Sequence, residues 1–225
     1  GIAGPIGLEI AGLAEEIDRP LSDVGYCSHH VHVTREMTRL HAEIAKPEKT
    51  SFFDLVKYKM DYANRICADY DDPATLMRIV MNTISLIRED ALSTPSRSKQ
   101  RQESDSDSIT KVVPKTAYII RQLKRPDEYD LLKRVYGNQF LLISANGGID
   151  QRKAVIAKKI KASAPMSTSA VEIANLVEKL MDRDQNEGAE EWGQHLRDTF
   201  HHGDVFVDGI DRDRMRSGLQ RFFQA

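Results

Sequence analysis

The chain opens with GIAGPIGLEI, residues 1–10, and this stretch decides how the fold begins. Its apolar residues 1–6 predict a short buried strand, and Gly4 and Gly7 predict a tight turn that leads into a helix. A strand, a glycine turn and a helix have the outline of a phosphate-binding loop, in which backbone N–H groups at the helix N-terminus hold phosphate. The stretch is therefore a working nucleotide site, a degenerate one, or a turn that only connects two elements.

The residues that complete a phosphate-binding loop are missing after Gly7. The pattern GxxxxGK[ST] requires a second glycine, a lysine that pairs with phosphate oxygens and a hydroxyl that holds Mg²⁺. Counted from Gly4, the second glycine position holds Glu9 and the next position holds Ile10. Because the carboxylate of Glu9 repels phosphate, we do not expect ATP hydrolysis here. Gly4 and Gly7 are the candidate phosphate turn of a degenerate nucleotide pocket, and a connecting turn is the alternative.

Beyond this stretch the chain alternates between apolar strand-like runs and segments with helical spacing. The predicted strands occupy residues 1–6, 24–33, 116–123, 140–148 and 204–209. The predicted helices occupy residues 8–17, 52–63, 74–88, 126–136, 150–161 and 169–182, with a last helix that carries Met215, Leu219, Phe222 and Phe223. Pro20 ends the first helix, and Gly137 ends the helix that Pro126 opens.

The strands and their turns predict the fold class. Apolar strands without alternation, separated by helices, predict a parallel sheet that helices cover on both faces. Glycine turns at the ends of strands place ligands at the carboxyl edge of such a sheet. We therefore expect an α/β fold of nucleotide-binding type: a doubly wound, mainly parallel sheet flanked by helices.

Composition narrows the partners and the compartment. The chain has 225 residues, 40% of them apolar and 29% charged, which suits one α/β domain over residues 1–225, although two small domains would also fit. A formal net charge of −2 gives no global attraction to nucleic acid or to an anionic membrane. No apolar run approaches the roughly 20 residues of a membrane span. Cys27 and Cys67 form no disulfide framework, so we predict a cytoplasmic protein.

Two further features concern the chain's organisation. Gly1 falls directly into a strand with no initiator Met, so we expect a fragment, or a chain from which segments are missing. The stretch STPSRSKQRQESDSDS, residues 93–108, has no large apolar residue and mixes both charge signs. It cannot bury enough surface to offset its ordering entropy, and predicts a mobile insert at about 93–110. A phosphorylatable regulatory segment is the alternative.

Histidines and cysteines do not form a predicted metal or catalytic site. His41 and Glu43 make the H-x-E half of a zinc deaminase signature, but neither cysteine has a partner at P-C-x-x-C spacing. With the ligand set incomplete, we interpret this match as coincidence. His29, His30 and His32 lie on a predicted strand, where His30 and His32 share a face, and we interpret them as ordinary strand histidines. The pair His201 and His202 gives the same weak signal.

Arginines provide the other candidate phosphate ligands. Arg183, Arg197 and Asp198 belong to a polar stretch before the last strand, where nucleotide kinases carry a mobile arginine-bearing lid that closes on phosphates. The alternative is a solvated stretch whose arginines and aspartates pair with each other. Arg121, at the end of a predicted strand, is either a phosphate ligand at the sheet edge or a partner of Asp127 or Glu128.

Two stretches together resemble a known family. TAYIIRQLKRPDEYDLLKRVYGNQFLLIS, residues 116–144, and LMDRDQNEGAEEWGQHLRDTFHHGDVFVDG, residues 180–209, resemble the N-terminal domain of bacterial anti-phage deoxycytidylate (dCTP/dCMP) deaminases. GIAGPIG at the start and KMDYANRICADYDDPATLMRIV, residues 59–80, support the resemblance. The most specific part is Gly193-Gln194, residues 197–200 and residues 204–208.

The resemblance implies a role in antiviral defence. In that family a P-loop, nucleotide-kinase-like domain precedes a zinc-dependent cytidine deaminase domain, a hydrolase that depletes the deoxycytidine nucleotide pool during phage infection. Some members have an atypical P-loop, which fits the turn at residues 4–7. The chain stops at Ala225, near where the deaminase domain begins in the family. Zinc and deaminase activity are therefore expected only in a parent protein, after residue 225.

Three hypotheses of function follow. In the first, the chain is a regulatory domain that senses a nucleotide or another inhibitor through Gly4, Gly7, Arg121, Arg183, Arg197 and Asp198, and controls its own C-terminal deaminase domain in a homo-oligomer. In the second, it is an active nucleoside or nucleotide kinase. In the third, it is an oligomerisation module that does not bind nucleotides and associates through the helix faces at residues 52–63 and 215–223.

Overall fold

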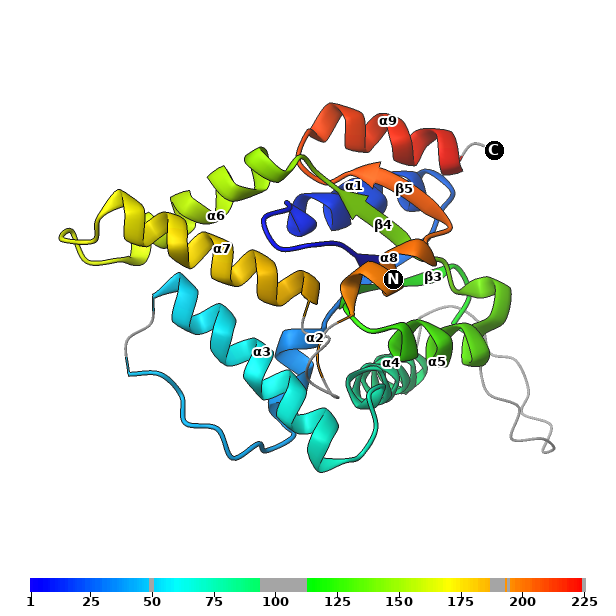
Figure 1. Cartoon of the computed structure of the whole chain (residues 1–225). Helices are drawn as coiled ribbons and strands as arrows, with labels where there is room; N and C mark the ends of the chain where they lie inside the picture. Colours follow the sequence, from blue (N-terminus) through cyan, green and yellow to red (C-terminus); the bar gives the residue numbers. More distant parts are fainter. Residues whose placement is uncertain (49–50, 94–112, 187–192, 194, 224–225) are drawn as a thin grey trace, which may run out of the picture.

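A parallel sheet forms the centre of the computed structural model, which describes residues 1–223 except 49–50, 94–112, 187–192 and 194 (Figure 1). Within that part of the chain the sheet has five strands: β1 (Ile2–Ala3), β2 (Cys27–His32), β3 (Thr116–Leu123), β4 (Ile143–Asn146) and β5 (Val205–Asp208). Each neighbouring pair is parallel. The predicted α/β fold with a helix-flanked parallel sheet is therefore confirmed.

Helices follow every strand of the described residues. They are α1 (Ile10–Asp23), α2 (Val33–Glu36), α3 (Phe52–Asp69), α4 (Thr75–Ser93), α5 (Pro126–Tyr136), α6 (Ile149–Ser163), α7 (Ala170–Asn186), α8 (Leu196–His201) and α9 (Arg212–Phe223), with the 3-10 helices η1 (Met37–Arg39) and η2 (Gly137–Gln139). The insert predicted at 93–110 lies outside the described residues, apart from Ser93 at the end of α4.

The strand order is β2-β3-β1-β4-β5. It differs from the 3-2-1-4-5-6 order of dinucleotide-binding folds and from the flavodoxin-like 2-1-3-4-5 order. The chain crosses from one side of β1 to the other between β3 and β4, which makes β1 the topological switch point. Ligands of open parallel sheets bind in the crevice outside the carboxyl ends of the strands at such a point. The turn that begins at Gly4 lies at this place.

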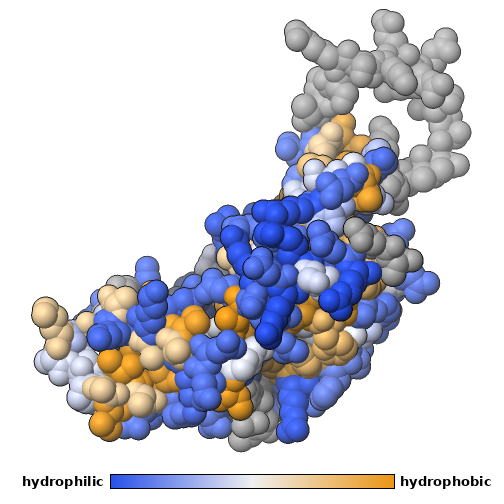
Figure 2. Space-filling model, turned by 90° about the horizontal axis from the view of Figure 1, so that it is seen from above, coloured by the Kyte–Doolittle hydropathy of each residue, from blue (hydrophilic) through white to orange (hydrophobic). Residues whose placement is uncertain are grey.

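Helices α1 and α9 cover one face of the sheet. Leu13, Ala14 and Ile17 of α1 pack with Met215 and Leu219 of α9 in one apolar cluster against the strands. The outer side of α9 is polar, and hydrophilic side chains gather at the centre of this face, where α9 lies (Figure 2). An amphipathic helix with this arrangement buries its apolar stripe and leaves its charges in water.

A buried carboxylate joins the two helices of this face. Glu16 of α1 is 2% exposed and accepts hydrogen bonds from Arg216 of α9, from Nε at 3.0 Å and from Nη2 at 3.1 Å. The hydrogen bond from Arg216 lowers the pKa of Glu16 below its ordinary value. The pair explains how a charged residue is tolerated on the inner side of α1.

Helices α4, α5 and α8 pack on the opposite face. The apolar cluster there includes Met77 of α4, Ile66 of α3, and Ile120 and Leu123 of β3. Ile119 belongs to the cluster on the α1 side, so neighbouring residues of β3 face opposite layers. This burial on both sides is the reason that the strand reads as a continuous apolar run.

A third apolar cluster lies apart from the other two. It joins α6 and α7 through Ile156, Ile160, Val177 and Leu180, and Phe52 of α3 packs against it. In Figure 1 these helices extend from the side of the sheet, and α6 follows the carboxyl end of β4 directly. Ile6, from the turn after β1, packs against the same cluster. The three helices thus face the carboxyl edge of the sheet.

Several predicted boundaries are wrong for identifiable reasons. Pro20 lies inside α1, because the missing N–H removes one hydrogen bond while Leu21, beyond it, still packs on the apolar cluster. β1 has only two residues, because Gly4 already turns the chain. The short helices α2 and α8 were not predicted, since fewer than seven residues give no readable helical period.

Candidate functional site

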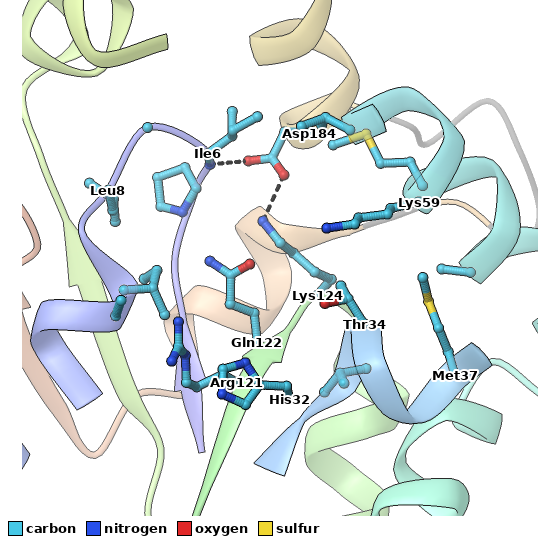
Figure 3. A pocket seen from close by; sticks show the side chains of 18 of the residues that line it. Ile6, Leu8, His32, Thr34, Met37, Lys59, Arg121, Gln122, Lys124 and Asp184 are labelled. Atoms are coloured by element: carbon cyan, nitrogen blue, oxygen red, sulfur yellow. Dashed lines mark hydrogen bonds and ion pairs between the residues drawn. The ribbon is translucent and has the colours of Figure 1, made fainter. Parts of the chain in front are cut away.

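A cavity of about 430 Å³ opens between the carboxyl edge of the sheet and the three helices α3, α6 and α7 (Figure 3). The turn after β1 forms one wall, and the ends of β2 and β3 form the floor. Its polar lining residues are Glu9, His32, Thr34, Lys59, Arg121, Gln122, Lys124, Arg125, Glu128, Lys159 and Asp184. The cavity therefore lies at the switch point, where ligands of parallel sheets bind.

Close packing requires glycine at both predicted positions of the turn. Gly7 has φ +91, and a Cβ at this position would lie 2.9 Å from the carbonyl oxygen of Arg152 in α6. A Cβ on Gly4 would lie 2.9 Å from Leu8 Cδ1 and 3.1 Å from the carbonyl oxygen of Ala145. Gly7 lines the cavity, whereas Gly4 is connected to it through its carbonyl oxygen, which accepts a hydrogen bond from the lining residue Lys124.

The Glu9 carboxylate does not place a buried negative charge at the turn. It is exposed and lies 4.0 Å from Lys159 Nζ of α6, while its backbone N–H donates to Gly209 O at 2.8 Å. The carboxylate and the lysine both border the cavity, so Lys159 offsets the negative charge at this wall.

Arg121 is the predicted residue that the structure places most clearly in the cavity. It lies in β3 and lines the cavity, and its Nε is buried without a hydrogen-bond partner among the described residues. Burial lowers the pKa of its guanidinium. Among the described residues no ion pair joins Arg121 to Asp127 or Glu128, and Glu128 bonds Arg125 instead. The charge of Glu15 also acts on Arg121 and raises its pKa, but Nε has no hydrogen-bond partner in the described structure, so the half-buried guanidinium favours an anion in the space in front of it.

His32 lies beside Arg121. The two residues are direct partners in the register of β2 and β3, and both line the cavity. Burial lowers the pKa of His32, and the positive charges of Arg121 and Arg35 lower it further. We therefore expect a neutral imidazole in the empty site, which gains a proton when an anion binds next to it.

Lys124 was not predicted as a site residue, and Asp184 was expected only as one of the polar residues of the lid stretch. Lys124 Nζ donates to Gly4 O at 2.9 Å and to Asp184 Oδ1 at 2.6 Å (Figure 3). The other oxygen of Asp184 accepts the backbone N–H of Ile6 at 2.6 Å. The sequence signal for Lys124 was the one used for Arg121, a basic residue at the end of a strand. Asp184 follows Arg183 directly, but only the folded helix brings it to the turn.

Arg125 and Glu128 form the buried floor of the cavity. Their side chains are 2% and 1% exposed, and Arg125 donates to Glu128 Oε1 at 3.3 Å and to Asn64 Oδ1 at 2.6 Å. Burial raises the pKa of Glu128, and Arg125 opposes that shift. Glu128 also accepts a hydrogen bond from the backbone N–H of Lys124 at 2.7 Å. The Arg125–Glu128 pair therefore fixes the backbone at Lys124.

An apolar wall faces these polar groups. Met37, Val56, Met60 and Leu76 line the cavity on the side of η1, α3 and α4. Lys59 of α3 is exposed and extends toward Lys124 from the opposite wall (Figure 3). The cavity therefore combines a cationic side with an apolar side, which suits a ligand with an anionic group and a flat or apolar body.

The three predicted lid residues do not line the cavity. Arg183 points to α3, where its Nη2 lies 2.6 Å from Asp61 Oδ1. Arg197 and Asp198 are exposed on α8, and Asp198 Oδ2 lies 4.0 Å from His195 Nδ1. Of the predicted nucleotide-binding residues, the structure thus brings Gly4, Gly7 and Arg121 together.

The histidines of β2 have other neighbours. His30 Nε2 lies 2.9 Å from both carboxylate oxygens of Asp18, and His29 stacks on Tyr118 with ring centroids 5.6 Å apart. His41 and Glu43 are both exposed. Within the described parts of the chain there is no group of three or more metal-ligating side chains.

Comparisons with known proteins do not assign a family. No protein-family model matches the chain, and no curated protein sequence matches it significantly. None of the described helices is long and apolar enough to cross a membrane. Fold and cavity define the class: an α/β protein with a parallel sheet and a cationic cavity at its carboxyl edge.

Proposed function

We propose that this chain is the P-loop-like, nucleotide-sensing regulatory domain of an anti-phage deoxycytidine nucleotide deaminase, and that the cavity at the sheet edge holds the nucleotide. The resemblance of residues 116–144 and 180–209 supports the parent activity. The cavity supports the sensing role, because it combines a glycine turn, cations and an apolar wall at a switch point.

The environment of Arg121 is the main evidence for nucleotide binding. Its Nε is buried without a partner in the described structure, in a cavity that three lysines also line. A phosphate in front of Arg121 would receive charge-assisted hydrogen bonds and restore the solvation that burial removes. The planar guanidinium suits two phosphate oxygens, which a lysine cannot bind in the same way.

The apolar wall suits the rest of a nucleotide. With the phosphate at Arg121, a base and sugar would lie toward Met37, Val56 and Met60. The thioether groups of methionine adapt to flat ring systems and contact them favourably. A cavity of about 430 Å³ is in the size range of sites for small organic ligands.

Coupling to the deaminase follows from where the ligand touches the chain. The cavity is lined by the sheet edge and by α3, α6 and α7, so a bound nucleotide contacts the sheet and these helices at once. A nucleotide that binds one relative arrangement of the sheet and the helices more tightly shifts the chain toward that arrangement. Zinc and the deamination chemistry belong to the C-terminal domain in this proposal.

Two alternatives are less well supported. An active kinase requires the lysine and the hydroxyl of a complete phosphate-binding loop, which are missing after Gly7, and Lys124, which reaches the turn, is bound to Asp184. The oligomerisation hypothesis relied on helix faces that the structure uses internally: Met60 and Ala63 of α3 are buried, as are Met215 and Leu219 of α9. Both faces therefore pack inside the chain.

Isothermal titration calorimetry tests the proposal. The chain is titrated with dCMP, dCTP, deoxycytidine and the ribonucleotides, with and without Mg²⁺, and Arg121→Gln is compared with Arg214→Gln. Arg214 carries the same charge, but its side chain is 77% exposed on α9. We expect nucleotide binding that falls about tenfold or more in Arg121→Gln only.

The same experiment has two contradicting results. Binding of no nucleotide at all would refute the sensing role. Equal affinity in Arg121→Gln and in the wild type would refute the assigned site. A γ-phosphate transfer assay on deoxycytidine and dCMP separates the kinase, which would form phosphorylated product, from a domain that only binds.

A further inference from the structure

Asp184 occupies an unusual position for a carboxylate. It lies in the last turn of α7, where the helix dipole disfavours negative charge, and it is 0% exposed. A buried aspartate at a helix C-terminus is tolerated only when other groups compensate its charge. Its surroundings therefore explain why the residue can stand there.

The compensation comes from the turn after β1. Ile6 N–H donates to Asp184 Oδ2 at 2.6 Å, and Lys124 Nζ donates to Oδ1 at 2.6 Å (Figure 3). A backbone N–H of a glycine turn and a lysine ammonium are the two kinds of donor that a phosphate-binding loop offers to phosphate. The carboxylate thus takes the donors that a ligand phosphate would use.

Arg152 shows that this place has further donor capacity. Its Nε donates to Ile6 O at 2.9 Å, and its Nη2 is buried without a partner in the described part of the chain. The residue is 3% exposed, and burial lowers the pKa of its guanidinium, while the charge of Asp184 raises it. Asp184 therefore stands among cationic groups that are not all hydrogen-bonded.

We propose that Asp184 is a specificity-determining residue that fills the anion position of the turn and restricts the cavity to ligands with a single phosphate. This inference deepens the proposed function and rests on it, since it concerns the phosphates of the same ligand. One phosphate binds at Arg121. A second or third phosphate that extends toward the turn finds the Ile6 N–H and the Lys124 ammonium already bound by the Asp184 carboxylate, so it gains no hydrogen bond there that would offset its desolvation.

The test uses polyphosphate without a nucleoside, so that it does not depend on base recognition. Inorganic tripolyphosphate and pyrophosphate are titrated into the wild type and into Asp184→Asn. The matched control is Asp61→Asn. Asp61 is also a carboxylate that pairs with a cation, since its Oδ1 lies 2.6 Å from Arg183 Nη2, but it does not line the cavity. We expect tripolyphosphate to bind Asp184→Asn about tenfold tighter than the wild type, with no gain in Asp61→Asn.

A folded Asp184→Asn without a gain would overturn the inference, as would an equal gain in Asp61→Asn. Should the variant fail to fold, amide NMR of the wild type decides. We expect tripolyphosphate to shift the Arg121 side-chain Nε–H signal and leave the Ile6 amide in place. A shift of the Ile6 amide that saturates together with that of Arg121 would contradict the blocking role.

The outcomes keep the two proposals apart. Nucleotide binding by the wild type without a polyphosphate gain in Asp184→Asn refutes the role of Asp184 and leaves the sensing role intact. A polyphosphate gain in Asp184→Asn, in a chain whose wild type binds no nucleotide, refutes the sensing role and leaves the role of Asp184 intact.

Discussion

The two ends of the cavity differ in whether their charged groups have hydrogen-bond partners. At the loop end, defined by Ile6, Gly7, Lys124 and Asp184, a partly buried cation and a buried anion are hydrogen-bonded to each other and to the turn. At the arginine end, defined by Arg121 and His32, the positive group has no hydrogen-bond partner among the described residues. Both ends line the same cavity, so the two sets of charged groups differ in their hydrogen bonds and not in the cavity that they face.

This difference separates stability from binding. Removing one partner of a satisfied buried pair leaves an uncompensated charge and costs folding free energy. Removing a cation without a partner costs little folding free energy but takes away the attraction for a ligand. Substitutions at the loop end should therefore act on unfolding, and substitutions at the arginine end on affinity.

The largest effect is expected for Lys124→Met. The substitution leaves the Asp184 carboxylate buried without its cation, and should lower the free energy of unfolding by about 3 kcal/mol. Denaturant titration followed by circular dichroism measures it. The double variant Lys124→Met, Asp184→Leu should recover most of the loss, because it removes both charges. A single variant as stable as the wild type would show that the pair does not hold the turn.

Gly7→Ala should cost about 2 kcal/mol of unfolding free energy, because it combines a φ of +91 with a Cβ 2.9 Å from Arg152 O. Gly25→Ala is the matched control, with φ +77 and an added Cβ that meets only the flexible end of the Lys115 side chain, at 3.3 Å from Nζ. Its cost should be about 1 kcal/mol, from backbone conformation. Thermal and denaturant unfolding of both variants measure the difference, and equal costs would argue against close packing of the turn on α6.

Arg121→Gln should lower nucleotide affinity and leave stability nearly unchanged, whereas Lys124→Met acts mainly on stability. We expect the free energy of unfolding to stay within about 1 kcal/mol of the wild type, since no partner of Arg121 is lost. Nucleotide affinity should fall about tenfold, and Arg121→Lys should restore only part of it, because an ammonium lacks the planar pair of donors. A large loss of stability in Arg121→Gln would instead assign the residue a structural role.

The smallest effect is expected from pH. Burial and the charge of Arg121 lower the pKa of His32 in the empty site, and a bound anion raises it again. Binding then takes up a proton, so affinity rises as pH falls below the ordinary histidine pKa of about 6.5. We expect about a threefold gain per pH unit in that range, measured by calorimetry.

His32→Asn is the control for this pH dependence, since it removes the imidazole and leaves the protonation of the ligand phosphate unchanged. The gain should be larger in the wild type than in the variant. Without ligand the sign reverses for stability: the unfolded chain binds the proton first, so His32 destabilises the fold as pH falls below about 6.5. Identical slopes in both proteins would show that His32 does not sense the anion.

Much of the fold could be predicted from the sequence because its signals are local. The run at residues 116–123 coincides with β3, and Pro126 and Gly137 mark both ends of α5. The boundaries of α1 could not be predicted, because packing of Leu21 on the apolar cluster outweighs the interruption by Pro20. Local propensity gives way to tertiary packing in such cases.

The candidate site was only half predictable. Gly4, Gly7 and Arg121 follow from strand ends and turn chemistry, which are features of neighbouring residues. Asp184 lies 178 positions after Ile6, the residue whose N–H it accepts, and no local pattern announces that contact. The predicted lid arginines failed to line the cavity because their direction depends on how α7 and α8 pack.

The sequence by itself determined the alternation of strands and helices, the parallel sheet and the glycine turn, because hydrophobic periodicity and backbone conformation act over a few residues. The tertiary structure alone decided which charges are satisfied. Lys124 is paired with Asp184, while Nε of Arg121 has no hydrogen-bond partner in the described structure, although Arg121 lies near the end of β3 and Lys124 directly follows that strand. That outcome depends on the placement of α7 over the turn, which is set by the apolar cluster that α3, α6 and α7 share.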